Sequence, residues 1–289
     1  MQIGITGATG FVGGAVAEAL RGRDDTVVPF SRRGGSGRRT FSLDRPADVS
    51  GLDGLVHLAG ESILGLWTRE KRRRIMESRV EGTRRLVEGI AASGVRPSVL
   101  VSASAIGFYG DTGDTIVDED SPAGEGFLAE VARAWEEEAV KARSLGVRVV
   151  LLRIGFVLAG KGGAMDLIRP VFRAGLGGRL GSGRQWMSCV WIGDLAAMAV
   201  RCLDDATVSG PVNAVMPQPV SNAGFTAAAA GAARRPALFP APAFALRLAL
   251  GDLSHLLLDS QRVVPSRLLS LGFSYRHPTV TSAMGEVFP

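Results

Sequence analysis

The 289-residue chain has few of the residues that build metal sites and disulfide scaffolds, and it has no long apolar run. Its two cysteines, Cys189 and Cys202, form no CxxC pair and have no histidine at ligand spacing. A zinc site or a disulfide framework needs more such residues in closer spacing, so we expect no bound metal. The longest candidate for a membrane span, residues 225–250, is interrupted by arginines and prolines. We therefore expect a globular protein without a membrane partner.

No signal peptide is recognisable before the first apolar run, which begins almost at Met1, so a cytoplasmic location is the default expectation. Hydrophobic residues make up 46% of the chain, enough for the core of a large α/β domain. The formal net charge is +5, and the densest basic run, residues 71–74, is flanked by glutamates at helical spacing. This pattern favours a solvated helix face over a nucleic-acid surface, and the basic excess suits an anionic cofactor.

The chain opens with an apolar run, a glycine-rich turn and a helical pattern. Residues 1–6 predict a buried strand, and the apolar spacing from Val12 to Leu20 predicts a helix. Between them, Gly7, Gly10 and Gly13 have the spacing GxxGxxG. A dinucleotide-binding turn needs glycine where φ is positive, where the backbone approaches a pyrophosphate and where helix and strand pack closely. The position of this turn favours that interpretation over an ordinary glycine-rich loop.

The second predicted strand, residues 26–30, ends at Ser31, Arg32 and Arg33. An acidic residue at this place in dinucleotide-binding folds accepts a hydrogen bond from a ribose hydroxyl, whereas arginine accommodates a 2′-phosphate. No Asp or Glu occupies this strand end, and a guanidinium can hold phosphate with two hydrogen bonds. The sequence therefore favours NADP(H) over NAD(H), the alternative being that both arginines are only surface charge.

Strands and helices alternate through the first half of the chain. Further strands are predicted at residues 40–44, 55–60, 99–104 and 147–154, and helices at 69–92 and 126–144. This alternation indicates an α/β fold, a Rossmann-like doubly wound parallel sheet. His57 lies inside an apolar strand, which is typical of a hydrogen-bonded core histidine.

The periodicity weakens after residue 159. A short strand is predicted at 186–192, a helix at 194–203 with Asp194 as its N-cap, and an apolar helix at 243–258. We interpret residues 1–160, completed by part of 186–215, as a cofactor-binding Rossmann domain. Residues 161–289 would form a smaller C-terminal substrate lobe interleaved with it.

The assembled motifs resemble the short-chain dehydrogenase/reductases of the extended kind, and more narrowly an atypical subgroup labelled NAD-dependent epimerase/dehydratase family protein. The resemblance covers essentially the whole chain. It rests on residues 6–13, Leu58–Glu61, Ser78–Val80, Ser102–Ala105 with Tyr109–Gly110, Phe127–Glu130 with Trp135–Glu136, Gly162–Ala164 and Gly181–Gln185, and on C-terminal residues including Ser221–Asn222, Ser260–Val263 and Gly272–Phe273.

The resemblance implies that the usual proton relay is missing. Extended members carry a serine or threonine, a Tyr-x-x-x-Lys pair and a supporting asparagine. In this chain the serine corresponds to Ser104, but Phe127 stands at the tyrosine position, Val131 at the lysine position and Arg79 at the asparagine position. Trp191 stands where relatives tend to have a histidine.

Two groups of site residues follow from these patterns. The predicted cofactor-binding residues are Gly7, Thr9, Gly10, Phe11, Val12, Gly13, Ser31, Arg32, Arg33, Leu43, Asp44, Leu58, Ala59, Gly60 and Arg79. The catalytic candidates are Ser104 and Ser102, as donors of a polarising hydrogen bond, and Tyr109, whose alternative role is to pack the edge of the sheet. Serine is a weak acid near neutral pH, so the proton itself would come from water or substrate.

Three functions are compatible with these features. The favoured one is an NADPH-dependent ketoreductase for a bulky, largely apolar or aromatic ketone, with Trp186, Trp191 and Phe225 closing the pocket. The second is a non-catalytic NADP(H)-binding sensor or scaffold, which the lost relay favours. The third is a nucleotide-sugar epimerase or dehydratase, which needs the missing tyrosine. We expect a small-molecule substrate, no nucleic-acid partner, and a monomer or homodimer.

Overall fold

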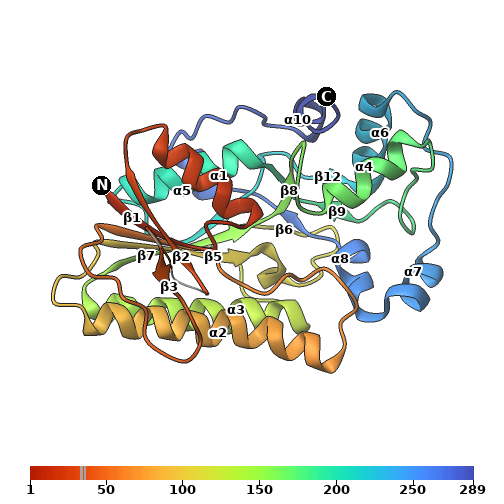
Figure 1. Ribbon diagram of the computed structural model, residues 1–289. Helices are drawn as coiled ribbons and strands as arrows, with labels where there is room; N and C mark the ends of the chain where they lie inside the picture. The colour runs from red at the N-terminus through yellow and green to blue at the C-terminus, as the bar shows by residue number, and fades with distance from the viewer. Residues whose placement is uncertain (33–34, 36) are drawn as a thin grey trace.

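A seven-stranded parallel sheet forms the centre of the molecule. The computed structural model describes residues 1–32, 35 and 37–289, and Figure 1 shows its layers. The strands lie in the order β11-β7-β5-β4-β1-β2-β3. Their bounds are β1 Gln2–Thr6, β2 Thr26–Ser31, β3 Arg39–Thr40, β4 Gly54–His57, β5 Val99–Ala105, β7 Arg148–Ile154 and β11 Gly210–Ala214.

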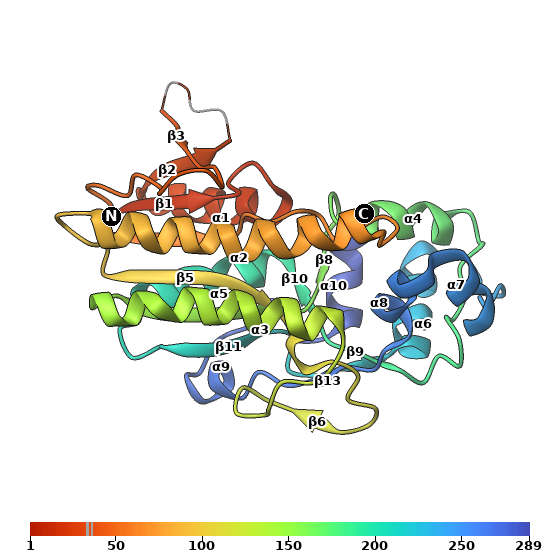
Figure 2. The same cartoon turned by 90° about the horizontal axis from the view of Figure 1, so that it is seen from below.

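Helices cover both faces of this sheet. Helices α1 (Phe11–Arg21) and α5 (Ile192–Asp204) pack on one face, and α2 (Arg69–Ala92) and α3 (Phe127–Val140) on the other (Figures 1 and 2). Strands buried on both sides must be apolar along their whole length, which explains runs such as Val99–Val101. The predicted Rossmann-like α/β fold is confirmed by this topology.

The strand order reverses at β1. Strand β1 pairs with β2 on one side and with β4 on the other, both in parallel register. In open α/β sheets, ligands bind beyond the carboxyl ends of the strands at such a switch point. The loops after β1 and β4 are therefore where the fold places a ligand.

A smaller lobe extends the molecule beyond the carboxyl edge of the sheet (Figure 2). Its core joins residues such as Met165, Phe225 and Met284. The lobe and its connections contain β8 Phe156–Leu158, α4 Met165–Arg173, β9 Trp186–Met187, β10 Cys189–Trp191, β12 Val220–Ser221, α6 Asn222–Ala233, α7 Ala243–Leu250, α8 His255–Leu258 and α10 Val280–Val287. Short elements β6 Ile116–Val117, β13 Arg262–Val263 and α9 Ser266–Ser270, and the 3-10 helices Ile106–Tyr109, Lys141–Leu145 and Gly251–Ser254, complete the chain.

Several predicted boundaries were wrong. The strand expected at 40–44 is only Arg39–Thr40. The stretch 186–192 splits into β9, which pairs with β12, and β10, which pairs with β8. The helix expected at 243–258 ends at Leu250, because Gly251 has a φ of 55°.

Asp194 is not an N-cap, because α5 begins two residues earlier, at Ile192. Its buried carboxylate instead accepts hydrogen bonds from the backbone N–H groups of Arg276 (2.8 Å) and His277 (2.9 Å). This contact fastens the C-terminal segment to the sheet domain. The division of the chain at residue 160 stays a prediction. Among the described residues, no helix combines the length and apolarity that crossing a bilayer requires.

Candidate cofactor site and buried polar network

The glycine turn between β1 and α1 leaves room for a ligand only because it has no side chains. Gly7 has a φ of 73°, and a Cβ there would lie 2.9 Å from the carbonyl carbon of Leu58. A Cβ on Gly13 would overlap the carbonyl oxygen of Gly7. Gly10 precedes α1 without a side-chain cap, so the first-turn N–H groups, including those of Phe11 and Val12, are available to an anion. This cradle fits a dinucleotide diphosphate.

Thr6 and His57 lock the loop after β4 against this turn. Thr6 Oγ1 accepts hydrogen bonds from the N–H groups of Leu58 (3.1 Å) and Ala59 (3.2 Å), so it donates to His57 Nδ1 (2.6 Å). We infer that His57 Nε2 donates to Thr83 Oγ1 (3.0 Å). Burial lowers the pKa of His57 to about 3. His57 is therefore neutral and structural, as predicted.

The loop after β8 covers the start of α1. The ring of Phe11 lies against the Gly162–Gly163 backbone, where a Cβ on either glycine would approach it to 2.6 Å. The sequence did not predict this contact with Phe11. The only local indication of a close backbone approach is a pair of glycines soon after a strand.

Arg79 lies beside the predicted cofactor path. Its Nη1 donates to the carbonyl oxygens of Glu61 (3.0 Å) and Ile75 (3.2 Å), and its guanidinium carbon is 5.1 Å from the centroid of Trp135. A Cβ on Gly60 would lie 3.2 Å from that carbon. Burial lowers the pKa of Arg79 to about 10, although the Glu61 carboxylate favours the charged form.

Of the remaining predicted cofactor residues, those that the structure describes lie around the same sheet edge. Ser31 ends β2, next to β1, and the exposed Arg32 follows it, whereas Arg33 lies outside the described residues. Leu43 and Asp44 are exposed beyond β3. The Leu43 carbonyl accepts a hydrogen bond from Arg85 on α2, and the Asp44 N–H donates to Ser42, so these bonds do not reach the glycine turn. Thr9 is exposed within the turn.

A buried polar network lies at the carboxyl ends of β5, β7 and β11. Arg153 donates to both carboxylate oxygens of Glu136, from Nε (2.8 Å) and Nη2 (2.9 Å). Ser104 donates to Glu136 Oε1 (2.7 Å). Arg153 Nη1 donates to the Tyr109 hydroxyl (2.8 Å), which in turn donates to Asn213 Oδ1 (2.8 Å). Both hydroxyl protons are thus directed to protein acceptors.

Two of the three predicted catalytic hydroxyls, those of Ser104 and Tyr109, belong to this network. Burial raises the pKa of Tyr109 to about 12, against the opposing effect of Arg153. Ser102 is fully buried, and its hydroxyl donates to the carbonyl of Ala103 (3.3 Å). A catalytic role for Ser102, Ser104 or Tyr109 stays a prediction. Sequence reasoning missed Arg153 and Asn213, and noted Glu136 only as part of a family motif.

An apolar cluster surrounds Phe127 and Val131, the two positions at which the resemblance predicts that relay residues are missing. The Phe127 ring packs edge-on against Trp67, with centroids 5.3 Å apart, and the Arg72 guanidinium carbon is 4.9 Å from its centroid. Val131 is buried in the same cluster with Trp67 and Ile75. Neither position holds a side chain that can transfer a proton.

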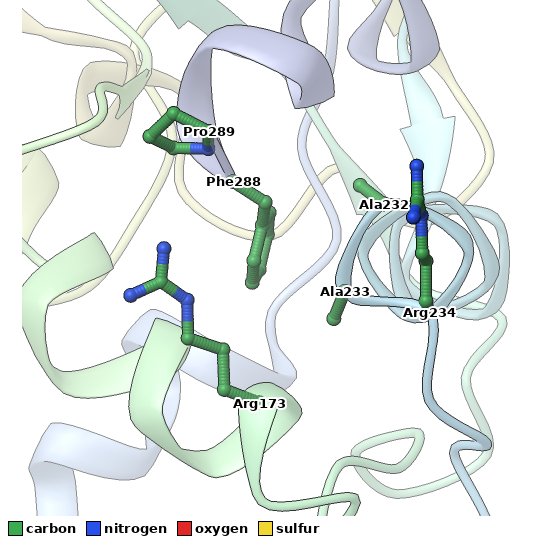
Figure 3. Close-up of a pocket in the computed structure, with 6 residues that line it drawn as sticks. All are labelled: Arg173, Ala232, Ala233, Arg234, Phe288 and Pro289. Carbon is green, nitrogen blue, oxygen red and sulfur yellow. The ribbon is translucent and has the colours of Figure 1, made fainter.

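Two surface hollows lie on the smaller lobe. One, of about 380 Å³, is lined by Arg173, Ala232, Ala233, Arg234, Phe288 and Pro289 (Figure 3). The other, of about 540 Å³, lies beside α6 and Leu238. Neither hollow includes residues of the glycine turn. The sheet topology and the conformation of the turn are what indicate the cofactor site.

The aromatic residues expected to close a substrate pocket line neither hollow. The Trp186 indole donates to Asp114 (2.9 Å), Trp191 packs on His277 with centroids 4.7 Å apart, and Phe225 is buried against Phe156. Among the described residues, no cluster of three or more His, Cys, Asp or Glu side chains could hold a metal ion.

The sheet topology and the glycine turn define a dinucleotide-binding α/β protein. The sequence pattern of the NAD dependent epimerase/dehydratase family matches residues 3–214, and a domain of unknown function, DUF1731, matches residues 241–287. The chain belongs to the NAD dependent epimerase/dehydratase family, which confirms the resemblance seen in the sequence.

Its relatives match over almost the whole chain. The epimerase family protein Mb2239 of Mycobacterium bovis is 38% identical over 98% of this chain and 96% of its own. The crystal structure of human epimerase family protein SDR39U1 with NADPH is 33% identical, covers 99% of both chains and has a TM-score of 0.94. A nucleoside-diphosphate sugar epimerase from Corynebacterium glutamicum is 36% identical with a TM-score of 0.83, over all of this chain and 58% of that longer one.

Proposed function

We propose that this protein binds NADP(H) and reduces a bulky, largely apolar or aromatic ketone. The observation that carries the proposal is the fit between the glycine turn and a dinucleotide diphosphate. The human relative solved with NADPH supports the choice of cofactor. The backbone at Gly7, Gly10 and Gly13 would hold the diphosphate, and Arg32 would pair with the 2′-phosphate.

Bound NADPH supplies a hydride, so this chain must hold the carbonyl and leave a route for a proton. The apolar cluster around Phe127 and Val131 cannot deliver that proton. Ser104 and Tyr109 donate their protons within the buried network. We therefore assign the proton to water or to an acidic hydroxyl of the substrate, while positioning against the cofactor lowers the barrier.

A non-catalytic NADP(H) sensor is the second candidate. The observation that favours it is the same network, because the protein's own hydroxyl groups near the relay positions are engaged with protein acceptors. The family's name also covers epimerases and dehydratases. Such a reaction would need a base at a position that is here Phe127.

The test measures both NADPH binding and ketone reduction. NADPH binding is measured by fluorescence titration, and a panel of aromatic and apolar ketones is screened for loss of NADPH absorbance. With an active ketone, Ser104→Ala and Tyr109→Phe should each lower kcat less than about a hundredfold, the low end of acid–base contributions. Tight NADPH binding without turnover of any ketone would favour the sensor. A loss of several thousandfold in either variant would refute the external proton.

A further inference from the structure

One segment of the smaller lobe exposes large apolar side chains among arginines. We call residues 234–248 the basic-apolar segment. It contains three arginines and no acidic residue. Four of its five large apolar side chains are exposed: Leu238 by 71%, Phe239 by 59%, Phe244 by 74% and Leu248 by 87%. Exposed apolar groups gathered in this way are typical of an interaction surface.

The fold holds this segment in a defined place. The Phe239 N–H donates to the carbonyl of Gly177 (3.2 Å), and the Ala241 N–H donates to that of Arg179 (2.9 Å). Phe244 and Leu248 follow one helical turn apart on α7, a helix with no buried residue. Their side chains are therefore presented outward on regular backbone.

The positive charge of the protein is concentrated around the same surface. Residues 161–185 and 217–251 together contain eight basic residues and one acidic residue, a net charge of +7. The whole chain carries +5, so the remainder carries −2. Figure 1 shows α4 and α6 side by side and α7 below them near α8, all at the end of the molecule opposite the N-terminus. This end is thus basic and apolar, and the rest of the chain is slightly acidic.

We propose that the basic-apolar segment docks the smaller lobe on the surface of an anionic lipid bilayer. Phe244 and Leu248 enter the boundary between headgroups and acyl chains, while Arg234, Arg235 and Arg247 pair with lipid phosphates. Exposed apolar side chains in a segment that also carries arginines match this environment in both charge and polarity. An acidic protein would satisfy the arginines, but lipid also accommodates separate, protruding apolar side chains. The docking is peripheral and revises the expectation that the protein has no membrane partner.

The test is sedimentation of the full chain with lipid vesicles. Vesicles of phosphatidylcholine alone are compared with vesicles of equal parts phosphatidylcholine and phosphatidylglycerol. The wild type should bind the anionic vesicles at least tenfold more tightly, and added salt should weaken this binding. Phe244→Glu/Leu248→Glu should lose at least tenfold, and so should Arg234→Ala/Arg235→Ala/Arg247→Ala, which keeps the apolar side chains.

The matched control is Val95→Glu/Leu269→Glu, which places two glutamates at exposed apolar positions outside the segment. It should bind as the wild type does, and equal urea midpoints establish that the variants fold. If the glutamate variant of α7 does not fold, the arginine variant decides. Binding that is equal for both lipids, or lost equally in the control, would overturn the proposal. A dimer that Phe244→Glu/Leu248→Glu dissociates, with no vesicle binding by the wild type, would also overturn it and identify a protein interface.

Discussion

Glu136 should be among the most important polar side chains for the stability of this protein. Its carboxylate accepts two hydrogen bonds from Arg153 and one from Ser104, all between 2.7 and 2.9 Å. In Glu136→Ala, Arg153, a residue only 4% exposed, would keep its hydrogen bond to the Tyr109 hydroxyl and a 3.5 Å contact to the Glu119 carbonyl. Breaking one side of a buried ion pair costs about 3–5 kcal/mol. That is a large part of the roughly 5–15 kcal/mol that stabilises a typical domain.

The same geometry predicts an order of effects. Ser104→Ala removes one hydrogen bond to a charged acceptor, so we expect a loss of about 1.5–3 kcal/mol. Its effect should be smaller than that of Glu136→Ala, because Arg153 still neutralises the carboxylate. Glu137→Ala changes an exposed neighbour on the same helix and should stay within about 0.5 kcal/mol of the wild type.

Equilibrium urea unfolding of the wild type and the three variants measures these differences, with the midpoint and slope fitted separately. A changed slope would indicate a changed unfolded or native state rather than a local loss. If Glu136→Ala costs less than about 1 kcal/mol, the Arg153 charge is not left uncompensated, and the buried network does not stabilise the fold as a unit.

Three further predictions concern the cofactor site. Gly10→Val should leave the protein folded, because a Cβ there meets only the Gly7 carbonyl oxygen, at 3.1 Å, but it should abolish NADPH binding, because the side chain would stand where the diphosphate approaches. Gly13→Ala should instead disturb the turn itself. Fluorescence titration of NADPH binding and circular dichroism of the fold distinguish the two variants. Arg32→Ala should remove an at least tenfold preference for NADPH over NADH, since a charge-assisted contact contributes roughly 1.5–3 kcal/mol, and equal affinities in the wild type by calorimetry would contradict this. Because the pKa of His57 is depressed to about 3, its stabilising contribution is complete above its unfolded-state pKa of about 6.5 and declines as the pH falls from there toward 3. Urea unfolding between pH 7 and 4 should show His57→Gln losing that dependence, and exposed His255→Gln retaining it.

The sequence could predict those elements whose signals are local. The predicted bounds of helix α2 match the observed ones, because its apolar residues recur at helical spacing along its whole length. In the structure, Thr68 caps its start by accepting a hydrogen bond from the Lys71 N–H (3.2 Å). The expected helix at 243–258 is predominantly apolar, yet Gly251, with a φ of 55°, breaks it. Where packing against another segment decides the structure, as for β9 and β10, the local pattern could not show the partner.

The same distinction separates the two halves of the site. The cofactor cradle is one contiguous stretch, so its glycines could be interpreted from spacing alone. The polar network joins β5, α3, β7 and β11, and its closest link in sequence, Arg153 to Glu136, spans 17 residues. No periodicity marks such a partnership, and a lone arginine inside an apolar strand gives no indication of its acceptor.

The family resemblance predicts that Phe127 and Val131 stand where a Tyr and a Lys would be, but the sequence does not show what surrounds these two side chains. The structure shows that Trp67 and Arg72, from the loop after β4 and the start of α2, lie against Phe127. Val131 is buried beside Trp67. The surroundings of Phe127 and Val131 are thus largely apolar, with Arg72 at the edge of the cluster. The glycine turn is built by β1, α1 and β4, and none of these elements contributes to the apolar cluster, so the turn does not depend on the cluster for its conformation.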